Sequence, residues 1–226
     1  MPALPPSART RVRRHPERGE YDRATIDAIL DEALICHLAW VADDGGPRVI
    51  PTIHVRAGDT LYVHGSEASR TLRALRTGIE CCLEATLIDG LVLARSTPKH
   101  SINYRSVVVL GRASVVEDPD EKVQALEAFS NRLLPGRWRD VRPPTATELK
   151  ATSILRIPLA EASAKVRTGP PKDDEDDYGW PVWAGVIPLA LVAGDPQPDP
   201  ALEVGFEPPV WSPPGHGRSA PGQNRQ

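Results

Sequence analysis

The stretch that organises this chain spans residues 48–76 and reads RVIPTIHVRAGDTLYVHGSEASRTLRALR. Residues 48–56 alternate β-forming side chains with others. Ala57-Gly58-Asp59 then supplies a tight turn, because glycine takes positive φ without steric cost. A second strand follows at residues 61–64, and a helix with an apolar face begins at Ser69. The pattern therefore predicts strand, turn, strand and helix in succession.

The start of this helix is a candidate phosphate site. Free N–H groups and the positive end of the helix dipole attract anions there, and Ser69 and Arg70 stand at that end. Arg48 and Arg105 stand at the starts of predicted strands, beside polar residues. Arginine at the end of an element is well placed to bind a phosphate oxygen. We therefore treat Arg48, Arg70 and Arg105 as candidate binding residues.

The rest of the chain predicts a small antiparallel barrel, because short strands follow one another through hairpin turns. Turns are expected at residues 43–46 and at Asp89-Gly90, and a bulge at Gly111. Pro98 keeps residues 96–103 out of a strand. The expected strands beyond the opening stretch cover residues 34–41, 79–88, 91–95, 104–116 and 153–167, with a break near Pro158. The expected helices start near Tyr21, at Asp118 with Pro119 in its first turn, and at Ala146.

Length and composition favour one domain with tails. The chain has 226 residues and a net charge of −3, which argues against nucleic acid or an anionic membrane surface as the main partner. We expect a disordered basic arm at residues 1–20, a folded domain at residues 21–193 and a proline-rich, weakly ordered tail at residues 194–226. The 3 cysteines have no metal-ligand spacing, and no leader or membrane-spanning pattern is seen, so a cytoplasmic location is expected.

No motif identifies a catalytic residue. The serines lie in no hydrolase motif, and the glycines form neither a Walker A loop nor a dinucleotide fingerprint. His54, His64 and His100 fit no metal-ligand spacing, so no metal cluster is expected. His64 ends a strand just before the candidate phosphate turn. It is either a hydrogen-bonded residue at a strand end or a contact to a cofactor or substrate, and the sequence leaves both open.

Three stretches of the chain resemble the pyridoxamine 5′-phosphate oxidase-like family of flavin-binding split β-barrels. The resemblance is strongest to its flavin-nucleotide-binding branch, which is related to the nitroimidazole-resistance reductases. The stretches are RVIPTIHVRAGDTLYVHGSEASRTLRAL (48–75), HSINYRSVVVLGRASVVED (100–118) and SAKVRTGPPKDDEDDYGWPVWAGVIPL (163–189). The resemblance implies a six-stranded antiparallel split barrel with a few flanking helices. It also implies a homodimer with FMN in the subunit interface.

The resemblance also implies which residues hold FMN. The first strand would follow the flavin ring through its backbone, the Ser-Arg pair would bind the phosphate, and Trp183 would approach the flavin of the other subunit. The implied cofactor-binding residues are Arg48, Val49, Ile50, Pro51, Thr52, His64, Gly65, Ser69, Arg70, Thr71, Arg105, Ser106 and Trp183.

The departures from the family shape the expected function. Thr71 stands where the oxidases have Lys, Ser106 stands where they have Gln, and their C-terminal Arg-x-His substrate motif has no match. We therefore expect an FMN-dependent oxidoreductase on an unknown small organic substrate, with a nicotinamide as electron donor, and not a true pyridoxamine phosphate oxidase. One alternative is a flavin store or sensor without turnover. Another is the same barrel carrying a deazaflavin or haem, with His64 or His100 as axial ligand.

Overall fold

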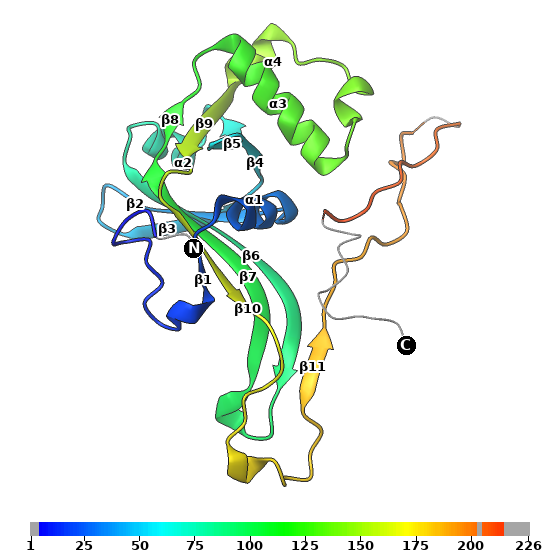
Figure 1. Ribbon diagram of the computed structural model, residues 1–226. Coiled ribbons are helices and arrows are strands. Elements are labelled where there is room, and N and C mark those ends of the chain that lie inside the picture. Colours follow the sequence, from blue (N-terminus) through cyan, green and yellow to red (C-terminus); the bar gives the residue numbers. More distant parts are fainter. Residues whose placement is uncertain (1–4, 203–204, 215–226) are drawn as a thin grey trace.

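Two antiparallel sheets carry the fold of the computed structural model, which describes residues 5–202 and 205–214 (Figure 1). The larger sheet has the order β1 (Gly19–Glu20), β10 (Ala162–Arg167), β7 (Ser101–Arg112), β6 (Glu80–Leu93), β2 (Cys36–Val41), β3 (Pro47–Thr52), and β11 (Gly185–Pro188) also pairs with β6. The smaller sheet has the order β4 (His54–Ala57), β5 (Thr60–Ser66), β9 (Thr152–Pro158), β8 (Ser114–Val115).

The chain crosses from one sheet to the other three times with almost no connecting loop. β3 passes into β4 at Ile53, β7 into β8 at Ala113, and β9 into β10 at residues 159–161. Counting each crossing pair as one long strand leaves the six strands of a split barrel, together with the short β1 and β11. The prediction of a mainly β, antiparallel split barrel is confirmed.

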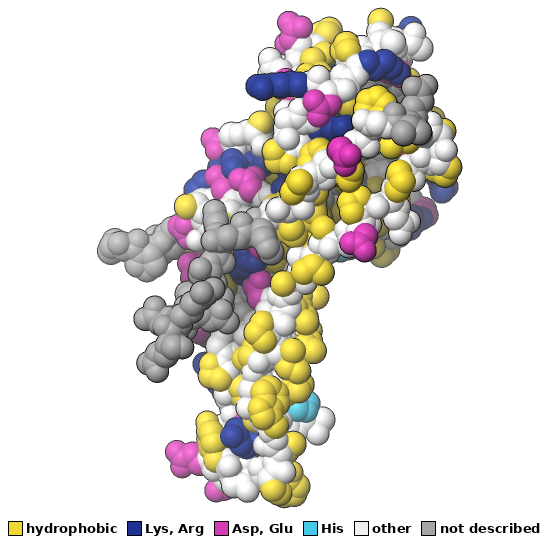
Figure 2. Space-filling view, turned by 90° about the vertical axis from the view of Figure 1, so that its right-hand side faces the viewer, with side chains coloured by type: hydrophobic (Ala, Val, Ile, Leu, Met, Phe, Trp, Pro, Cys, Tyr) yellow, Lys and Arg dark blue, Asp and Glu magenta, His cyan; other side chains and the backbone are white. Residues whose placement is uncertain are grey.

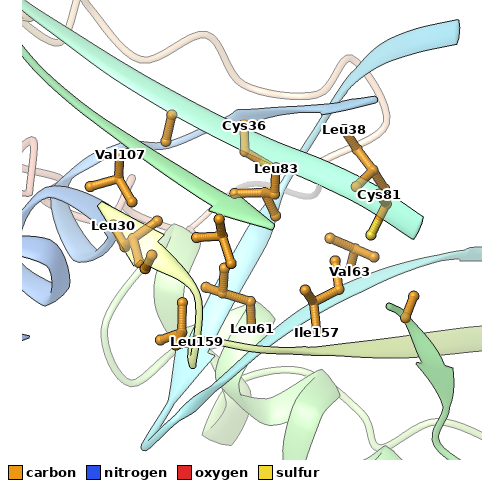
Figure 3. Packing of buried hydrophobic residues seen from close by; sticks show 14 of the residues in the cluster. Leu30, Cys36, Leu38, Leu61, Val63, Cys81, Leu83, Val107, Ile157 and Leu159 are labelled. Carbon is orange, nitrogen blue, oxygen red and sulfur yellow. The ribbon is translucent and has the colours of Figure 1, made fainter. Parts of the chain in front are cut away.

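The hydrophobic core fills the space between the two sheets (Figure 3). Leu38 and Leu83 from the larger sheet and Leu61 and Ile157 from the smaller one are at most 1% exposed. Burying one such side chain contributes about 1.5–3 kcal/mol. The strand predicted at residues 34–41 forms as β2, and its Cys36 and Leu38 face this core.

In the described part of the chain, four α-helices flank the barrel: α1 (Arg23–Glu32), α2 (Arg70–Leu75), α3 (Pro119–Leu133) and α4 (Ala146–Ala151). The predicted cap of α3 is confirmed, because the Asp118 side chain accepts from Asp120 N at 2.9 Å. Thr145 and Glu148 form a reciprocal capping box at α4. In Figure 1, α3 and α4 lie beyond the smaller sheet. The connections also contain short 3₁₀ helices, η1 (Pro16–Arg18), η2 (Thr97–Lys99), η3 (Arg137–Arg139) and η4 (Glu175–Asp177).

The predicted turn at Asp89-Gly90 is wrong. β6 continues through it with a bulge between Ile88 and Gly90, and residues 101–103, expected in a loop, are paired with β6. Pairing with β7 on one side and β11 on the other satisfies the backbone along this length, which overrides the local turn preference. Two further predictions need correction. The single strand predicted at residues 48–56 is divided at Ile53 into β3 and β4. The bulge predicted at Gly111 does not form, because β7 continues through Gly111 and ends before Ala113. β1 and β11 were not expected from the sequence.

The outer ends of β6 and β7, with η2 between them and β11 alongside, project from the barrel as an arm (Figure 1). The acidic segment Asp173–Asp177 is hydrogen-bonded to residues near the tip of this arm. The Asp173 carboxylate accepts from the Arg95 backbone N at 2.9 Å and from its Nη1 at 2.8 Å. Tyr178 packs its ring under the same guanidinium, 4.9 Å from Cζ to the ring centroid.

Both predicted tails make contacts in the described residues. Arg9 pairs with Glu80 and Glu161, and Trp211 donates from Nε1 to the Leu133 carbonyl at 2.7 Å. Residues 1–4, 203–204 and 215–226 lie outside the description. The domain limits at residues 21 and 193 stay predictions.

Arg105 joins α1 to the base of the arm. Its Nη1 and Nη2 bind the two Glu32 oxygens at 2.6 and 2.8 Å, while Nη2 and Nε bind Asp89 at 2.7 and 3.0 Å. All three side chains are less than a third exposed. The two carboxylates raise the pKa of Arg105, so it stays charged.

Replacing Arg105 with Met leaves Glu32 and Asp89 without a counter-charge. We expect Arg105→Met to lower the free energy of unfolding by about 2–3 kcal/mol, as lost charged hydrogen bonds typically do. Urea denaturation measures this. The solvent-screened pair Lys99–Asp174 provides the control, since Lys99→Met should cost much less than Arg105→Met. Equal costs for the two variants would contradict a structural role for the Arg105 network.

Candidate functional site

The strand predicted to follow the cofactor ring is an edge strand. β3 ends the order of the larger sheet, and within the described residues it pairs with β2 alone, so one row of its backbone groups is open there. Val49 is 62% exposed, and Arg48, Pro47 and Pro51 are exposed as well. Arg48 Nη2 binds Asp44 Oδ2 at 2.5 Å, in the turn between β2 and β3. The strand is thus accessible, but Arg48 is already paired.

The residues predicted to bind phosphate lie together where β5 leads into α2. Ser69 caps α2, its Oγ accepting from Leu72 N at 3.4 Å. Arg70 is exposed and has no ion pair within the described chain, while Thr71 is half-buried. Gly65 packs so closely on α2 that an added Cβ would lie 3.0 Å from Leu72 Cδ1. Glycine therefore lets β5 end against the helix.

The strand register brings the end of β3 to this same corner. His54 of β4 lies opposite Val63 of β5, so the preceding Thr52, at the end of β3, lies close to the end of β5. We call this place the β3–α2 corner. It contains the predicted residues of β3, the end of β5 and the start of α2.

The structure places the remaining predicted residues elsewhere. The donors of Arg105 go to Glu32 and Asp89. Ser106 donates to the Lys165 carbonyl at 3.4 Å within the larger sheet. Trp183 is 61% exposed beside β11, on the arm at the opposite end of the molecule from α2 (Figure 1). Within one chain, none of these arrangements adds a side chain to the β3–α2 corner.

His64 opens onto a cavity of about 440 Å³ between β5 and the helices α3 and α4. Its ring packs on Phe129, with 4.3 Å between ring centroids. The cavity is lined by His64, Leu126, Phe129, Ser130, Leu133, Trp138, Arg142, Pro144 and Glu148. Arg142 is bound to Glu148, Nη1 to Oε2 at 2.8 Å and Nη2 to Oε1 at 2.5 Å. We call this space the His64 cavity.

The imidazole of His64 has no hydrogen-bond partner among the described residues. Its Nδ1 is fully enclosed, and Nε2 forms no hydrogen bond either. Burial lowers the pKa of His64, so the ring is neutral at pH 7. A buried polar atom without a partner costs free energy, and a neutral imidazole nitrogen is a common metal ligand. The site is therefore suited to a group that accepts a nitrogen ligand and fills an apolar space.

The other two candidate histidines have structural partners. His54 Nε2 lies 2.9 Å from the Leu30 carbonyl, which ties β4 to α1. His100 Nδ1 accepts from Ala94 N at 2.9 Å at the tip of the arm. Of the three, only His64 has neither ring nitrogen hydrogen-bonded within the described residues. No group of three or more His, Cys, Asp or Glu residues in the described ranges could hold a metal ion.

Sequence reasoning missed the walls of the His64 cavity. Leu126, Phe129 and Leu133 follow the helical spacing of α3, which predicts an ordinary core-facing stripe. In the structure Leu133 remains 51% exposed, and the stripe faces a space that the barrel does not fill. Trp138 and Arg142 reach the cavity from the segment after α3, and no sequence signal indicated this.

The chain is similar to known flavin-binding proteins in sequence and fold. A family model described as pyridoxamine 5′-phosphate oxidase matches residues 22–166. Among solved structures, flavocytochrome Anf3 from Azotobacter vinelandii is 43% identical, covering 92% of this chain and 96% of that one, with a TM-score of 0.86. An FAD and heme binding protein from Mycobacterium smegmatis is 35% identical, covering 85% and 94%, with a TM-score of 0.81.

A more distant structure shares the fold alone. It is a protein named for 5-nitroimidazole antibiotic resistance, from Bacteroides thetaiotaomicron, which is 22% identical over 66% of this chain and 86% of that one, with a TM-score of 0.56. No curated protein matches the chain. No helix in the described part of the chain is long and apolar enough to cross a membrane.

The buried His54 makes stability depend on pH. Burial lowers its pKa to about 4 from an ordinary 6.5. The unfolded chain therefore binds more protons than the folded one between these values, and stability falls as the pH falls through that window. We expect His54 to contribute a loss of roughly 3 kcal/mol between pH 7 and pH 4. Urea denaturation of wild type and His54→Gln should show a shallower pH dependence in the variant, whereas parallel curves would contradict this.

Proposed function

Because the chain belongs to the pyridoxamine 5′-phosphate oxidase family, we propose that it is a flavin-dependent oxidoreductase that carries haem as a second cofactor. One observation carries the proposal: the unpartnered His64 imidazole faces an apolar cavity. The relatives support it, since one is named a flavocytochrome and the other an FAD and heme binding protein. The proposal thus combines the expected flavin with the haem that the sequence offered as an alternative cofactor.

The β3–α2 corner is the proposed flavin site. The open backbone of β3 offers donors and acceptors to a flat, polar ring edge. Arg70, exposed and without an ion pair in the described chain, supplies a positive charge for a phosphate, and Ser69 stands beside it. The sequence predicts FMN, while the Mycobacterium relative is named for FAD. Extraction and chromatography of the bound flavin distinguish the two.

The His64 cavity is the proposed haem site. His64 would bind the haem iron through a ring nitrogen, and Leu126, Phe129, Leu133 and Trp138 would supply apolar walls. Haem exchanges single electrons and flavin exchanges one or two, so the pair would connect a two-electron donor to a one-electron acceptor. The protein's part is to keep His64 neutral and to exclude water from the apolar side of the cavity.

A homodimer is part of the proposal. Ile187, Leu91 and Ile102 lie side by side across β11, β6 and β7, and they are 43%, 37% and 42% exposed. Figure 2 shows hydrophobic side chains gathered along the arm. An apolar stripe of this kind on a projecting arm favours burial against another protein surface. A second copy of the chain would cover it and bring the exposed Trp183 to the other subunit.

His64→Ala tests the assignment of the two cofactors. We expect the wild-type protein to show flavin absorption and an intense Soret band, and His64→Ala to lose the Soret band while it keeps its flavin. His100→Ala is the matched control, because His100 is held by the Ala94 backbone. It should retain both cofactors.

Three results would contradict the proposal. Haem retained with an unchanged spectrum in His64→Ala would remove His64 as ligand. A flavin that neither NADH nor NADPH reduces would favour a store or sensor over an oxidoreductase. Absence of flavin after reconstitution with FMN and FAD would reject the flavin site itself.

Charging the apolar stripe tests the dimer. We expect Ile102→Lys to shift the protein from dimer to monomer in light scattering coupled to size-exclusion chromatography, because the lysine would have to be buried without a partner. Val141→Lys is the control, since Val141 is 37% exposed outside the arm. A dimer in both variants would place the interface elsewhere.

A further inference from the structure

Arg167, the last residue of β10, is a buried arginine without a carboxylate partner in the described chain. It is 7% exposed, and its one hydrogen bond runs from Nη1 to Asn103 Oδ1, a neutral acceptor. Asn103 Nδ2 donates to the Gly169 carbonyl at 3.2 Å, which orients the amide. Arg95 and Arg105, by contrast, each face carboxylates. A buried charge is normally paired, so Arg167 lacks the partner that its burial calls for.

The remaining donors of Arg167 are accessible. Its Nε and Nη2 make no hydrogen bond within residues 5–202 and 205–214. Three side-chain polar atoms in these residues are both fully enclosed and without a hydrogen-bond partner: Nδ1 of His54, Nδ1 of His64 and Oγ of Ser153. Because Nε and Nη2 of Arg167 are not in this set, they are not fully enclosed. The stem of the side chain is therefore covered while part of the guanidinium reaches the surface. A ligand can approach it.

Arg18 lies near Arg167, and Lys165 stands two residues before it on β10. β1 pairs with β10, with Gly19 opposite Lys165, which brings the preceding Arg18 alongside. Burial lowers the pKa of Arg167, and the charge of Arg18 lowers it further. Lys165 has no ion pair in the described residues, and the nearest carboxylate to Arg18 is Glu17, 3.8 Å from its Nε. We call Arg18, Lys165 and Arg167 the basic corner.

Glu17 pairs with Arg18, while Lys165 and Arg167 have no carboxylate partner in the described residues. Glu17 precedes Arg18 and also binds His15 Nδ1 at 3.1 Å, and the exposed Glu20 lies opposite Ala164. Tyr104, opposite Arg167, can offer a hydroxyl group. Two neighbouring guanidinium groups, with a lysine two residues along the same strand, form an excess of donors and positive charge.

We propose that the basic corner binds a phosphate group. Planar guanidinium forks match the oxygens of a phosphate, and a doubly charged oxyanion would balance both arginines. The corner is separate from the proposed flavin site within one chain. β10 and β3 are separated by β7, β6 and β2 in the larger sheet. The phosphate belongs either to a free anion or to a nucleotide such as a flavin or nicotinamide cofactor.

Calorimetric titration with inorganic phosphate, at ionic strength matched with sodium chloride, tests the proposal on the purified protein. We expect wild type to bind phosphate and Arg167→Gln to bind it at least about tenfold more weakly, with Arg167→Lys between them. Arg139→Gln is the control, because Arg139 is exposed and has no ion pair in the described chain. It should bind phosphate as wild type does.

Thermal unfolding separates this role from a structural one. In chloride, Arg167→Gln should be as stable as wild type or more so, because it removes an unbalanced buried charge. In phosphate, wild type alone should gain stability. A variant that is less stable in chloride, or that turns monomeric, would assign Arg167 to the fold or to a partner carboxylate and overturn the proposal. So would phosphate binding that Arg167→Gln leaves unchanged.

Competition identifies the source of the phosphate. FMN, FAD, NADH or NADPH should displace inorganic phosphate if its own phosphate occupies the basic corner, and its affinity should then fall at least about tenfold in Arg167→Gln. Displacement by none of them assigns the corner to a free oxyanion. The His64→Ala variant should bind phosphate normally, so loss of haem and loss of phosphate binding report on different proposals.

Discussion

The pairing of β6 with β7 is the interaction on which the rest of the structure depends. It runs from Glu80 opposite Arg112 to Val92 opposite Ser101, longer than any other pairing in the described chain. Its inner half provides a wall of the barrel, with Leu83 and Val109 facing the core. Its outer half leaves the barrel and becomes the arm, to which β11 adds a strand. One continuous hairpin thus supports both the core and the surface that the dimer proposal uses.

The candidate sites lie where this frame leaves polar groups unsatisfied. Most half-buried charges are paired, as in the Arg105 network, and such pairs fix neighbouring elements. His64 and Arg167 differ, because each is covered by the fold while its polar atoms lack a matching partner in the described chain. A folded protein tolerates such a cost when a bound group removes it. The proposals for haem and for phosphate both follow from this reasoning.

Local sequence signals were reliable wherever neighbouring residues satisfy one another. The hairpin turn at residues 43–46, the cap at Asp118 and the helix from Ala146 all form as predicted, because their hydrogen bonds close within a few residues. Asp89-Gly90 shows the limit of such signals. Its composition favours a turn, but pairing on both sides of β6 keeps it extended and makes the Asp89 carboxylate a partner of Arg105.

The sequence by itself determined the antiparallel strands and the helix caps, because each is encoded in short-range spacing, and its resemblance to a known family indicated the residues of the β3–α2 corner. Only the tertiary structure decided which histidine is left without a partner. His54, His64 and His100 are alike in sequence, yet the Leu30 carbonyl and the Ala94 N–H occupy two of them. The third faces a cavity made by α3, more than 60 residues further along the chain. Partners so distant in sequence meet only when the barrel closes, so no local pattern could reveal which polar atoms it would leave unsatisfied.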